Sequence, residues 1–423
     1  MLSTPAENSL HLVNTMTGTR QAFVPLAAGT VKMFTCGPSI YGAPHLGNYR
    51  TFLFEDILQR YLEYRGCRVD RLINFTDIED KAIEKAGKNR QQLRDVTMEA
   101  AEKFYRNTGL LHIRIPDFIP RSSTSVDQAV KLIKELVNKG FAYRLGSDFF
   151  YDPLKFEGFG RLYGLDMSRW PEKKIRFRRD TYPGNRWNRG DFILWHGYNS
   201  RRDGDVYWET ELGRGRPSWN IQDPAIITKH LGFQIDIACG GVDNLFRHHD
   251  YNIAVIEAVS GREFSSFWLH GEHVLLDGKK MSKSKGNIVY PDDLLAKNMS
   301  AAGIRFLLIS IHYRRKLNLT ESIMREKEEQ CRALQALARQ FTGPLSTVGA
   351  DNPQAEKHIR GMASDFESAM NNDLNVGQAC VSLRHRLEKL ALIRPGKGLG
   401  KKQWSRIRES LLRIDSVLRI LFE

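Results

Sequence analysis

Residues 276–287 read Leu-Asp-Gly-Lys-Lys-Met-Ser-Lys-Ser-Lys-Gly-Asn, a cationic loop rich in small polar residues. Its lysines Lys280 and Lys283 offer compact point charges that suit the triphosphate of ATP. The small side chains of Ser282 and Ser284 let the backbone fold close over a bound nucleotide. Taken alone, such a run also fits a solvated surface loop. The loop predicts a contact with nucleotide phosphates.

A second phosphate-binding turn lies far upstream, where residues 44–48 read Pro-His-Leu-Gly-Asn. At the mouth of a helix, His45 and Asn48 can donate hydrogen bonds where the helix dipole already favours an anion, and we expect Gly47 to contact ATP as well. Because two phosphate-binding segments occur in one chain, the sequence predicts an ATP-using, adenylate-forming enzyme that also uses Mg²⁺.

The composition is that of an ordinary protein with room for two or three domains. The chain has 423 residues, of which 41% are hydrophobic. No segment resembles a secretory signal or a membrane span, so we expect a cytoplasmic protein without a membrane partner. The cysteines are scattered and odd in number, which favours reduced thiols: Cys36, Cys67, Cys239, Cys331 and Cys380. The net charge of +14 suits a polyanionic partner, and equally a merely basic surface.

Hydrophobic periodicity predicts a nucleotide-binding βαβ unit near the N-terminus. We expect a strand over 31–35, a helix over 51–64 and a strand over 68–75. Further along, 125–143 predicts a helix with a capping box of Ser125 and Gln128. The sheet should resume after an insertion, with a strand over 233–238.

Composition changes suggest four segments. We expect 24–144 and 218–300 to form the two halves of a catalytic domain, with a connective domain inserted at 145–217. A helical bundle should follow over 301–423. The insertion carries a basic run made of Lys173, Lys174, Arg176, Arg178 and Arg179, which could contact phosphates or form a solvated face.

From about residue 10 onward the chain resembles the cysteinyl-tRNA synthetase family of class I aminoacyl-tRNA synthetases. Besides the two phosphate-binding segments, the resemblance is carried by residues 34–41, 74–81, 191–195, 216–219, 240–243 and 248–250. It implies an α/β fold in which a Rossmann-like nucleotide-binding domain carries an inserted domain and a C-terminal α-helical domain. It also implies that Asp243 lies near the ribose of ATP, and that Thr76 and Trp219 lie beside the amino acid. Asn48 replaces a histidine common in the family but remains a hydrogen-bond donor.

The family's zinc site is altered in this chain. Family members hold zinc with two cysteines, a histidine and a glutamate, and the substrate thiolate completes the shell. The matching positions here are Cys36, Asp223, His248 and Asn252. Asparagine is a poor zinc ligand, and the loss of one thiolate removes soft character. Although Cys239 is an alternative ligand, we expect little zinc and therefore doubt specificity for cysteine.

The amino-acid pocket is predicted to differ in two further ways. Ala238 stands where the family has a histidine, which enlarges the pocket or removes a polar partner. Asp223 adds a carboxylate that is costly to bury unless it is paired. Its partner is either a lysine or arginine of the protein or a cationic substrate. We therefore predict a polar or cationic amino acid in place of cysteine.

The acceptor stays open between a tRNA, a small molecule and a peptide amine. The sequence ends at Glu423, where family members usually continue into a small anticodon-reading domain. Our leading hypothesis is a paralogue that activates an amino acid other than cysteine. The alternatives are a true cysteine–tRNA ligase that charges tRNA(Cys) and a non-catalytic tRNA-binding or regulatory pseudo-synthetase. The intact 280–284 loop argues against the last alternative.

Overall fold

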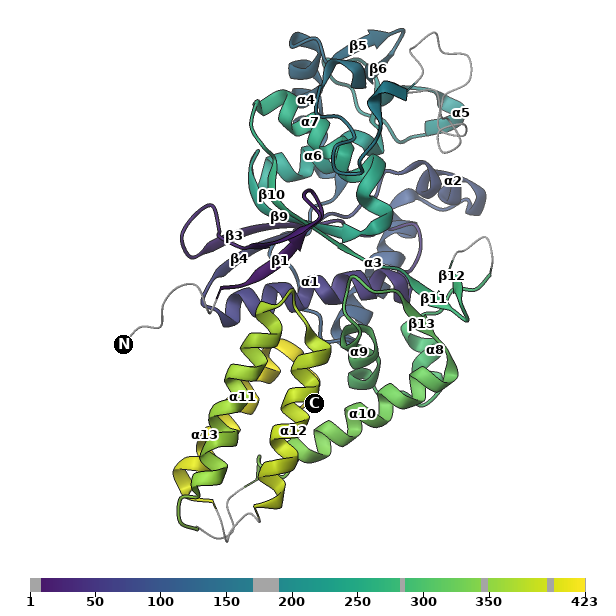
Figure 1. Ribbon diagram of the computed structural model, residues 1–423. Coiled ribbons are helices and arrows are strands. Elements are labelled where there is room, and N and C mark those ends of the chain that lie inside the picture. The colour runs from purple at the N-terminus through teal and green to yellow at the C-terminus, as the bar shows by residue number, and fades with distance from the viewer. Residues whose placement is uncertain (1–8, 170–189, 282–285, 344–348, 394–398, 423) are drawn as a thin grey trace.

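A four-stranded parallel sheet forms the centre of the computed structural model, which describes residues 9–169, 190–281, 286–343, 349–393 and 399–422. Its strands lie in the order β10-β9-β3-β4 (Figure 1). Their bounds are Ser265–Gly271, Ile235–Gly241, Thr30–Thr35 and Arg68–Ile73. β3 and β4 pair in parallel across α1 (Leu46–Tyr64). The predicted βαβ unit is therefore confirmed, although α1 begins five residues before the expected helix at 51.

Two further layers lie on the upper side of this sheet in Figure 1. Next to the sheet lie α6 (Trp219–His230) and α7 (Asp250–Ser260), and α4 (Val126–Asn138) packs against both. Above them an antiparallel sheet is formed by β5 (Ala142–Leu145), β6 (Asp148–Tyr151), β7 (Phe192–Gly197) and β8 (Gly215–Pro217). The predicted basic run at 173–179 lies outside the described residues.

Short elements connect these layers. The hairpin of β1 (His11–Asn14) and β2 (Thr19–Ala22) packs beside β10. At the other edge, α2 (Asp80–Asn89) and α3 (Leu93–Leu110) follow β4, and α5 (Ser200–Asp203) contacts α2. A three-stranded sheet has the strand order β12 (Lys279–Lys280), β11 (Val274–Leu276) and β13 (Leu317–Leu319).

Helices fill the C-terminal part of the chain and extend below α1 in Figure 1. They are α8 (Pro291–Ala296), α9 (Ala301–Ser310), α10 (Glu321–Arg339), α11 (Pro353–Asn371), α12 (Val376–Leu392) and α13 (Lys401–Leu418). The periodicity predicted helices throughout this region and missed β13, which pairs with β11. Within the described part of the chain, each helix is too short or too polar to cross a bilayer.

The predicted capping box at Ser125 is wrong. Ser125 is the N-cap of α4, but its side chain accepts no hydrogen bond from the first turn. Its Oγ is buried and has no hydrogen-bond partner. The sequence pattern S-x-x-Q permits a capping box but does not enforce it, and Gln128 instead donates to Thr228 Oγ1 at 3.0 Å.

A buried ion pair fastens α1 to the C-terminal helices. Arg305 of α9 donates to Asp56 of α1 at 2.6 Å, and both side chains are fully buried. Arg305 also donates to the carbonyls of Leu418 and Leu111. Removing one member of such a pair leaves an unpaired buried charge, which costs far more than the pair itself contributes.

We predict that Arg305→Ala lowers the free energy of unfolding by about 3–5 kcal/mol, because it leaves the Asp56 carboxylate buried without its main partner. Arg60 also pairs with Asp56 but is partly exposed, so Arg60→Ala should cost only about 1 kcal/mol. Urea unfolding followed by circular dichroism measures both values. An equal loss of unfolding free energy in the two variants would contradict the conclusion that Arg305 is the main partner of Asp56.

Candidate active site

The turn at 44–48, which is predicted to bind phosphate, caps the N-terminus of α1. His45 is the N-cap, and its Nδ1 accepts a hydrogen bond of 3.0 Å from the Gly47 backbone. In return, the His45 backbone donates to Asn48 Oδ1 at 3.0 Å. Because the Asn48 oxygen faces inward, only its Nδ2 amide can serve as the expected phosphate donor. The helix start is thereby fixed beside an anion-binding position.

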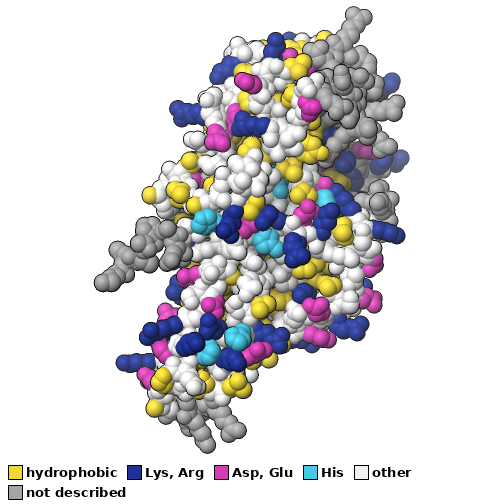
Figure 2. Space-filling view, viewed as in Figure 1, with side chains coloured by type: hydrophobic (Ala, Val, Ile, Leu, Met, Phe, Trp, Pro, Cys, Tyr) yellow, Lys and Arg dark blue, Asp and Glu magenta, His cyan; other side chains and the backbone are white. Residues whose placement is uncertain are grey.

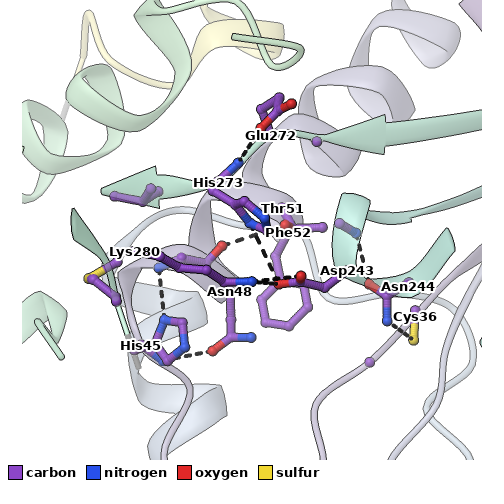
Figure 3. A pocket seen from close by; sticks show the side chains of 16 residues that line it. Cys36, His45, Asn48, Thr51, Phe52, Asp243, Asn244, Glu272, His273 and Lys280 are labelled. Carbon is purple, nitrogen blue, oxygen red and sulfur yellow. Dashed lines mark hydrogen bonds and ion pairs between the residues drawn. The ribbon is translucent and has the colours of Figure 1, made fainter. Parts of the chain in front are cut away.

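A cavity of about 220 Å³ opens above this turn (Figure 3). It is lined by the carboxyl ends of β3, β9 and β10, by the start of α1 and by β12: Cys36, Gly37, His45, Gly47, Asn48, Thr51, Phe52, Gly241, Asp243, Asn244, Gly271, Glu272, His273, Val274, Lys280 and Met281. Ligands of open parallel sheets bind at this position, outside the carboxyl ends of the strands. Figure 3 shows His45 and Lys280 at one side of the cavity and Cys36 with Asn244 at the other.

Charged groups meet at the mouth of the cavity. Lys280 Nζ lies 2.7 and 2.9 Å from the two oxygens of Asp243, and His273 Nδ1 lies 3.6 Å from Asp243 Oδ2. Burial lowers the pKa of His273, and Lys280 adds to this effect, while Asp243 opposes it. Lys280 and Asp243 are about half exposed, so their ion pair contributes little to stability and can open for a ligand. Ser282, Lys283 and Ser284 lie outside the described residues.

A second cluster lies at the Cys36 end of the cavity. Ligand atoms of Cys36, Asp223 and His248 all lie within 4.8 Å of one another. The Trp219 ring lies 5.0 Å from that of His248, between centroids. His248 follows Arg247, whose positive φ of 75° marks a strained turn before α7. Three separate segments thus bring the predicted residues together.

Asn74 completes this cluster, and sequence reasoning gave it no role. Its Nδ2 donates to Asp223 Oδ1 at 2.7 Å and to Thr76 Oγ1 at 3.3 Å. Its Oδ1 accepts a hydrogen bond of 2.7 Å from the Gly37 backbone. Asn244, also missed, donates to Cys36 Sγ at 3.3 Å. Asn74 directly follows β4, which ends at Ile73, whereas the predicted strand ran on to residue 75 and hid this strand-end position.

Two predicted residues are deeply buried. Ala238 is fully buried in β9, in an apolar cluster with Phe34 and Trp268 of the neighbouring strands. The structure therefore does not bring its side chain to the cavity surface. Asn252 is 2% exposed, and its Nδ2 has no hydrogen-bond partner.

The donor set does not fit a four-ligand zinc site. Cys36, Asp223 and His248 offer suitable atoms, but Asn252 offers an amide. Burial, with added repulsion from Asp223 and Glu55, raises the pKa of the Cys36 thiol well above its ordinary value. Zinc binds the thiolate, so zinc binding here would release the thiol proton of Cys36.

The carboxylate of Asp223 lies close to His248. Among the described residues, no lysine or arginine forms an ion pair with it, and His248 Nδ1 lies 3.8 Å from its Oδ2. Of the two partners that the sequence left open for Asp223, a protein lysine or arginine is therefore excluded within the described chain.

The cavity lies at the carboxyl ends of an open parallel sheet, where α/β enzymes bind nucleotides. The family model described as tRNA synthetases class I (C) catalytic domain matches residues 22–329. A cysteine–tRNA ligase of Chlamydia pneumoniae is 35% identical over 414 residues, which span 97% of this chain and 86% of that protein. One from Chlamydia abortus is 36% identical over 383 residues, spanning 90% and 79%.

Solved structures show the same fold at low identity. Methionyl-tRNA synthetase of Mycobacterium tuberculosis in complex with methionyl-adenylate aligns with a TM-score of 0.65 and 15% identity, covering 93% of this chain and 90% of that one. The agnB2 LeuRS–tRNA–LeuAMS complex of Agrobacterium radiobacter K84 gives a TM-score of 0.66 and 13% identity, covering 94% and 85%. This fold is that of a class I aminoacyl-tRNA synthetase. The chain belongs to the cysteinyl-tRNA synthetase family, and it is a ligase.

We predict that Gly37→Ala destabilises the protein, because a Cβ at this position would overlap the main-chain oxygen of Asn74. Overpacking of this kind typically costs about 1–3 kcal/mol. Gly241→Ala is the matched control, since its Cβ would meet no atom closer than 3.6 Å. Thermal unfolding should show a lower Tm for Gly37→Ala alone, and the contact argument fails if both variants melt together.

Proposed function

We propose that this enzyme activates a polar or cationic amino acid, not cysteine, as its aminoacyl-adenylate. The observation that carries the proposal is the buried Asp223 carboxylate, which lies at the floor of the site without a lysine or arginine partner among the described residues. A buried carboxylate favours a bound cation, because the cation removes the penalty of an unpaired charge.

The proposed reaction is nucleophilic displacement at the α-phosphorus of ATP. A carboxylate oxygen of the amino acid forms a bond to this phosphorus, and pyrophosphate leaves with the electron pair of the broken P–O bond. We assign phosphate contacts to His45, Gly47 and Asn48, and stabilisation of the leaving group to Lys280 and Lys283 with Mg²⁺. The catalytic gain comes from positioning and charge stabilisation.

The remaining site residues hold the two substrates. Asp243 would accept hydrogen bonds from the ribose hydroxyls once Lys280 leaves it for the phosphates. Ser282 and Ser284 complete the nucleotide contacts. The amino acid would lie between Thr76 and Trp219.

Transfer completes the proposed cycle. An acceptor hydroxyl or amine attacks the acyl carbon of the adenylate, and AMP leaves. The acceptor remains a tRNA, a small molecule or a peptide amine.

Cysteine–tRNA ligation is the second candidate function. It is favoured by the names of the chlamydial relatives and by the two retained zinc-site residues, Cys36 and His248. Amino-acid-dependent ATP–pyrophosphate exchange over all the common amino acids separates the two candidates, because it reports activation without requiring the acceptor.

We predict that Lys280→Ala and Lys283→Ala each slow pyrophosphate exchange by roughly a hundredfold, since one transition-state charge contact is worth about 2–4 kcal/mol. Stability should not change for Lys280→Ala, because the side chain is about half exposed. Lys279→Ala, one residue away on the same exposed strand, is the control and should retain activity. Full exchange activity in both active-site variants would rule out the loop assignment.

We predict that Asp223→Asn abolishes activation of the preferred amino acid while ATP binding is unchanged, because only the side-chain contact is lost. A site built on a polar contact rejects analogues without it by about 10⁴-fold. Exchange kinetics and ATP titration measure the two effects. The proposal would be falsified if cysteine were the preferred amino acid and Asp223→Asn left its exchange kinetics unchanged. Elemental analysis would then show one zinc per chain, and Cys36→Ser would lose it.

A further inference from the structure

Both flanks of the 280–284 loop are tied to α1, the helix that begins at the 44–48 turn. We propose that Arg50 of α1 is a positioning residue for Lys280, because the segment that it holds, residues 308–319, supports the strand that carries this lysine. The inference rests on the proposed function, in which Lys280 stabilises the leaving pyrophosphate. It names the residue that aligns Lys280 with the 44–48 turn.

Arg50 holds this segment against the start of α1. It is 1% exposed and does not line the cavity. Its guanidinium donates to four main-chain carbonyls at 2.6–3.4 Å, those of Leu308, Ile311, His312 and Arg315. Because the guanidinium cannot touch a ligand in the cavity, any effect of Arg50 on a nucleotide must pass through the segment that it holds.

The strand that carries Lys280 is built on the same segment. β13 pairs in parallel with β11, and β11 pairs antiparallel with β12, where Leu275 lies opposite Lys280. In the turn between β11 and β12, the Gly278 backbone donates to Asn318 Oδ1 at 2.7 Å. A displacement of residues 308–319 would therefore carry Lys280 with it.

A second connection joins the other flank of the loop to α1. The Leu46 backbone donates to the Val289 carbonyl at 2.9 Å. Asn287 Nδ2 donates to the Lys280 carbonyl at 3.1 Å. Because both flanks are attached to one helix, α1 sets the distance between Lys280 and the turn at His45. Catalysis by positioning depends on such distances, and a misplacement of about 1 Å can cost about a hundredfold in rate.

The first test is a double-mutant cycle in the full-length protein, measured by ATP–pyrophosphate exchange with the amino acid that the wild-type protein activates best. Arg50→Lys keeps the charge, but one ammonium has three donors and cannot serve four carbonyls. We expect Arg50→Lys to slow exchange at least about tenfold. In the Lys280→Ala background, where the positioned group is absent, the loss should be less than about twofold. The inference is wrong if both backgrounds lose the same factor.

Arg216→Lys is the matched control, since Arg216 is also a buried arginine but pairs with Asp203 of α5. It should change the exchange rate by the same factor with and without Lys280. If its effect depended on Lys280 as strongly as that of Arg50→Lys, the loss of any buried arginine would disturb the loop, and the inference would be overturned.

Asn318 provides a second test at an exposed position, which matters if Arg50→Lys unfolds the protein. Asn318→Ala removes the acceptor for the Gly278 N–H, whereas Asn318→Asp keeps one. We expect Asn318→Ala to slow pyrophosphate exchange by roughly threefold, the worth of one hydrogen bond, and Asn318→Asp to retain the wild-type rate. Equal rates in the two variants would overturn the inference, because the proposed route to Lys280 runs through this turn.

Amide hydrogen exchange separates the inference from the proposed function. Arg50→Lys should speed hydrogen exchange in peptides that cover 272–280 and 311–319, while β6 and β7 keep their wild-type protection. Unchanged protection over 272–280 would overturn the inference whether or not the enzyme activates an amino acid. Faster hydrogen exchange there, with full pyrophosphate exchange in Lys280→Ala, would instead reject the proposed phosphate contact and leave the link between Arg50 and the Lys280 strand intact.

Discussion

The buried ion pair between Asp56 and Arg305 fixes the position of α1, the helix that begins at the 44–48 turn. Burial alone would raise the pKa of Asp56, but Arg305 and Arg60 hold it below its ordinary value. The lowered pKa means that the pair stabilises the fold above the pKa of the unfolded carboxyl, and that this stability is lost as the pH falls through the folded value. Because Arg305 also caps carbonyls near α3 and α13, one side chain joins the nucleotide-binding half to the helical half.

Two other α1 side chains extend this constraint to the site. Arg50 donates to the carbonyls of Leu308, Ile311, His312 and Arg315, which fixes the loop behind the cavity. Glu55 pairs with Arg71 of β4 beneath the sheet, and burial raises the pKa of Glu55 to about 8 despite that arginine. The phosphate turn at the head of α1 is thus held against the strand ends from two directions. Lys280 and Asp243, by contrast, are about half exposed at the mouth of the cavity.

Sequence patterns predicted the features that depend on interactions between residues close together in the chain. The βαβ unit and the helical C-terminal region followed from hydrophobic periodicity, and the structure brings Cys36, Asp223 and His248 to within 4.8 Å of one another. The missed features depend on distant partners: β13 pairs with β11, and Gln128 donates to Thr228, 100 residues away, instead of completing the capping box. Asn74 was missed for the same reason, since its partners Gly37 and Asp223 lie 37 and 149 residues away in sequence. The specific roles given to the site residues stay predictions.

The proposed change of substrate depends on the charge of the cluster formed by Cys36, Asp223 and His248. Burial and the neighbouring carboxylates raise the pKa of the Cys36 thiol, so the cysteine stays protonated and neutral. Asp223 then supplies the only full negative charge in the Cys36, Asp223 and His248 cluster. A metal ion held by Cys36 would have to displace the thiol proton. The proposed substrate cation requires no such change, because Asn74 already holds the carboxylate of Asp223 in place.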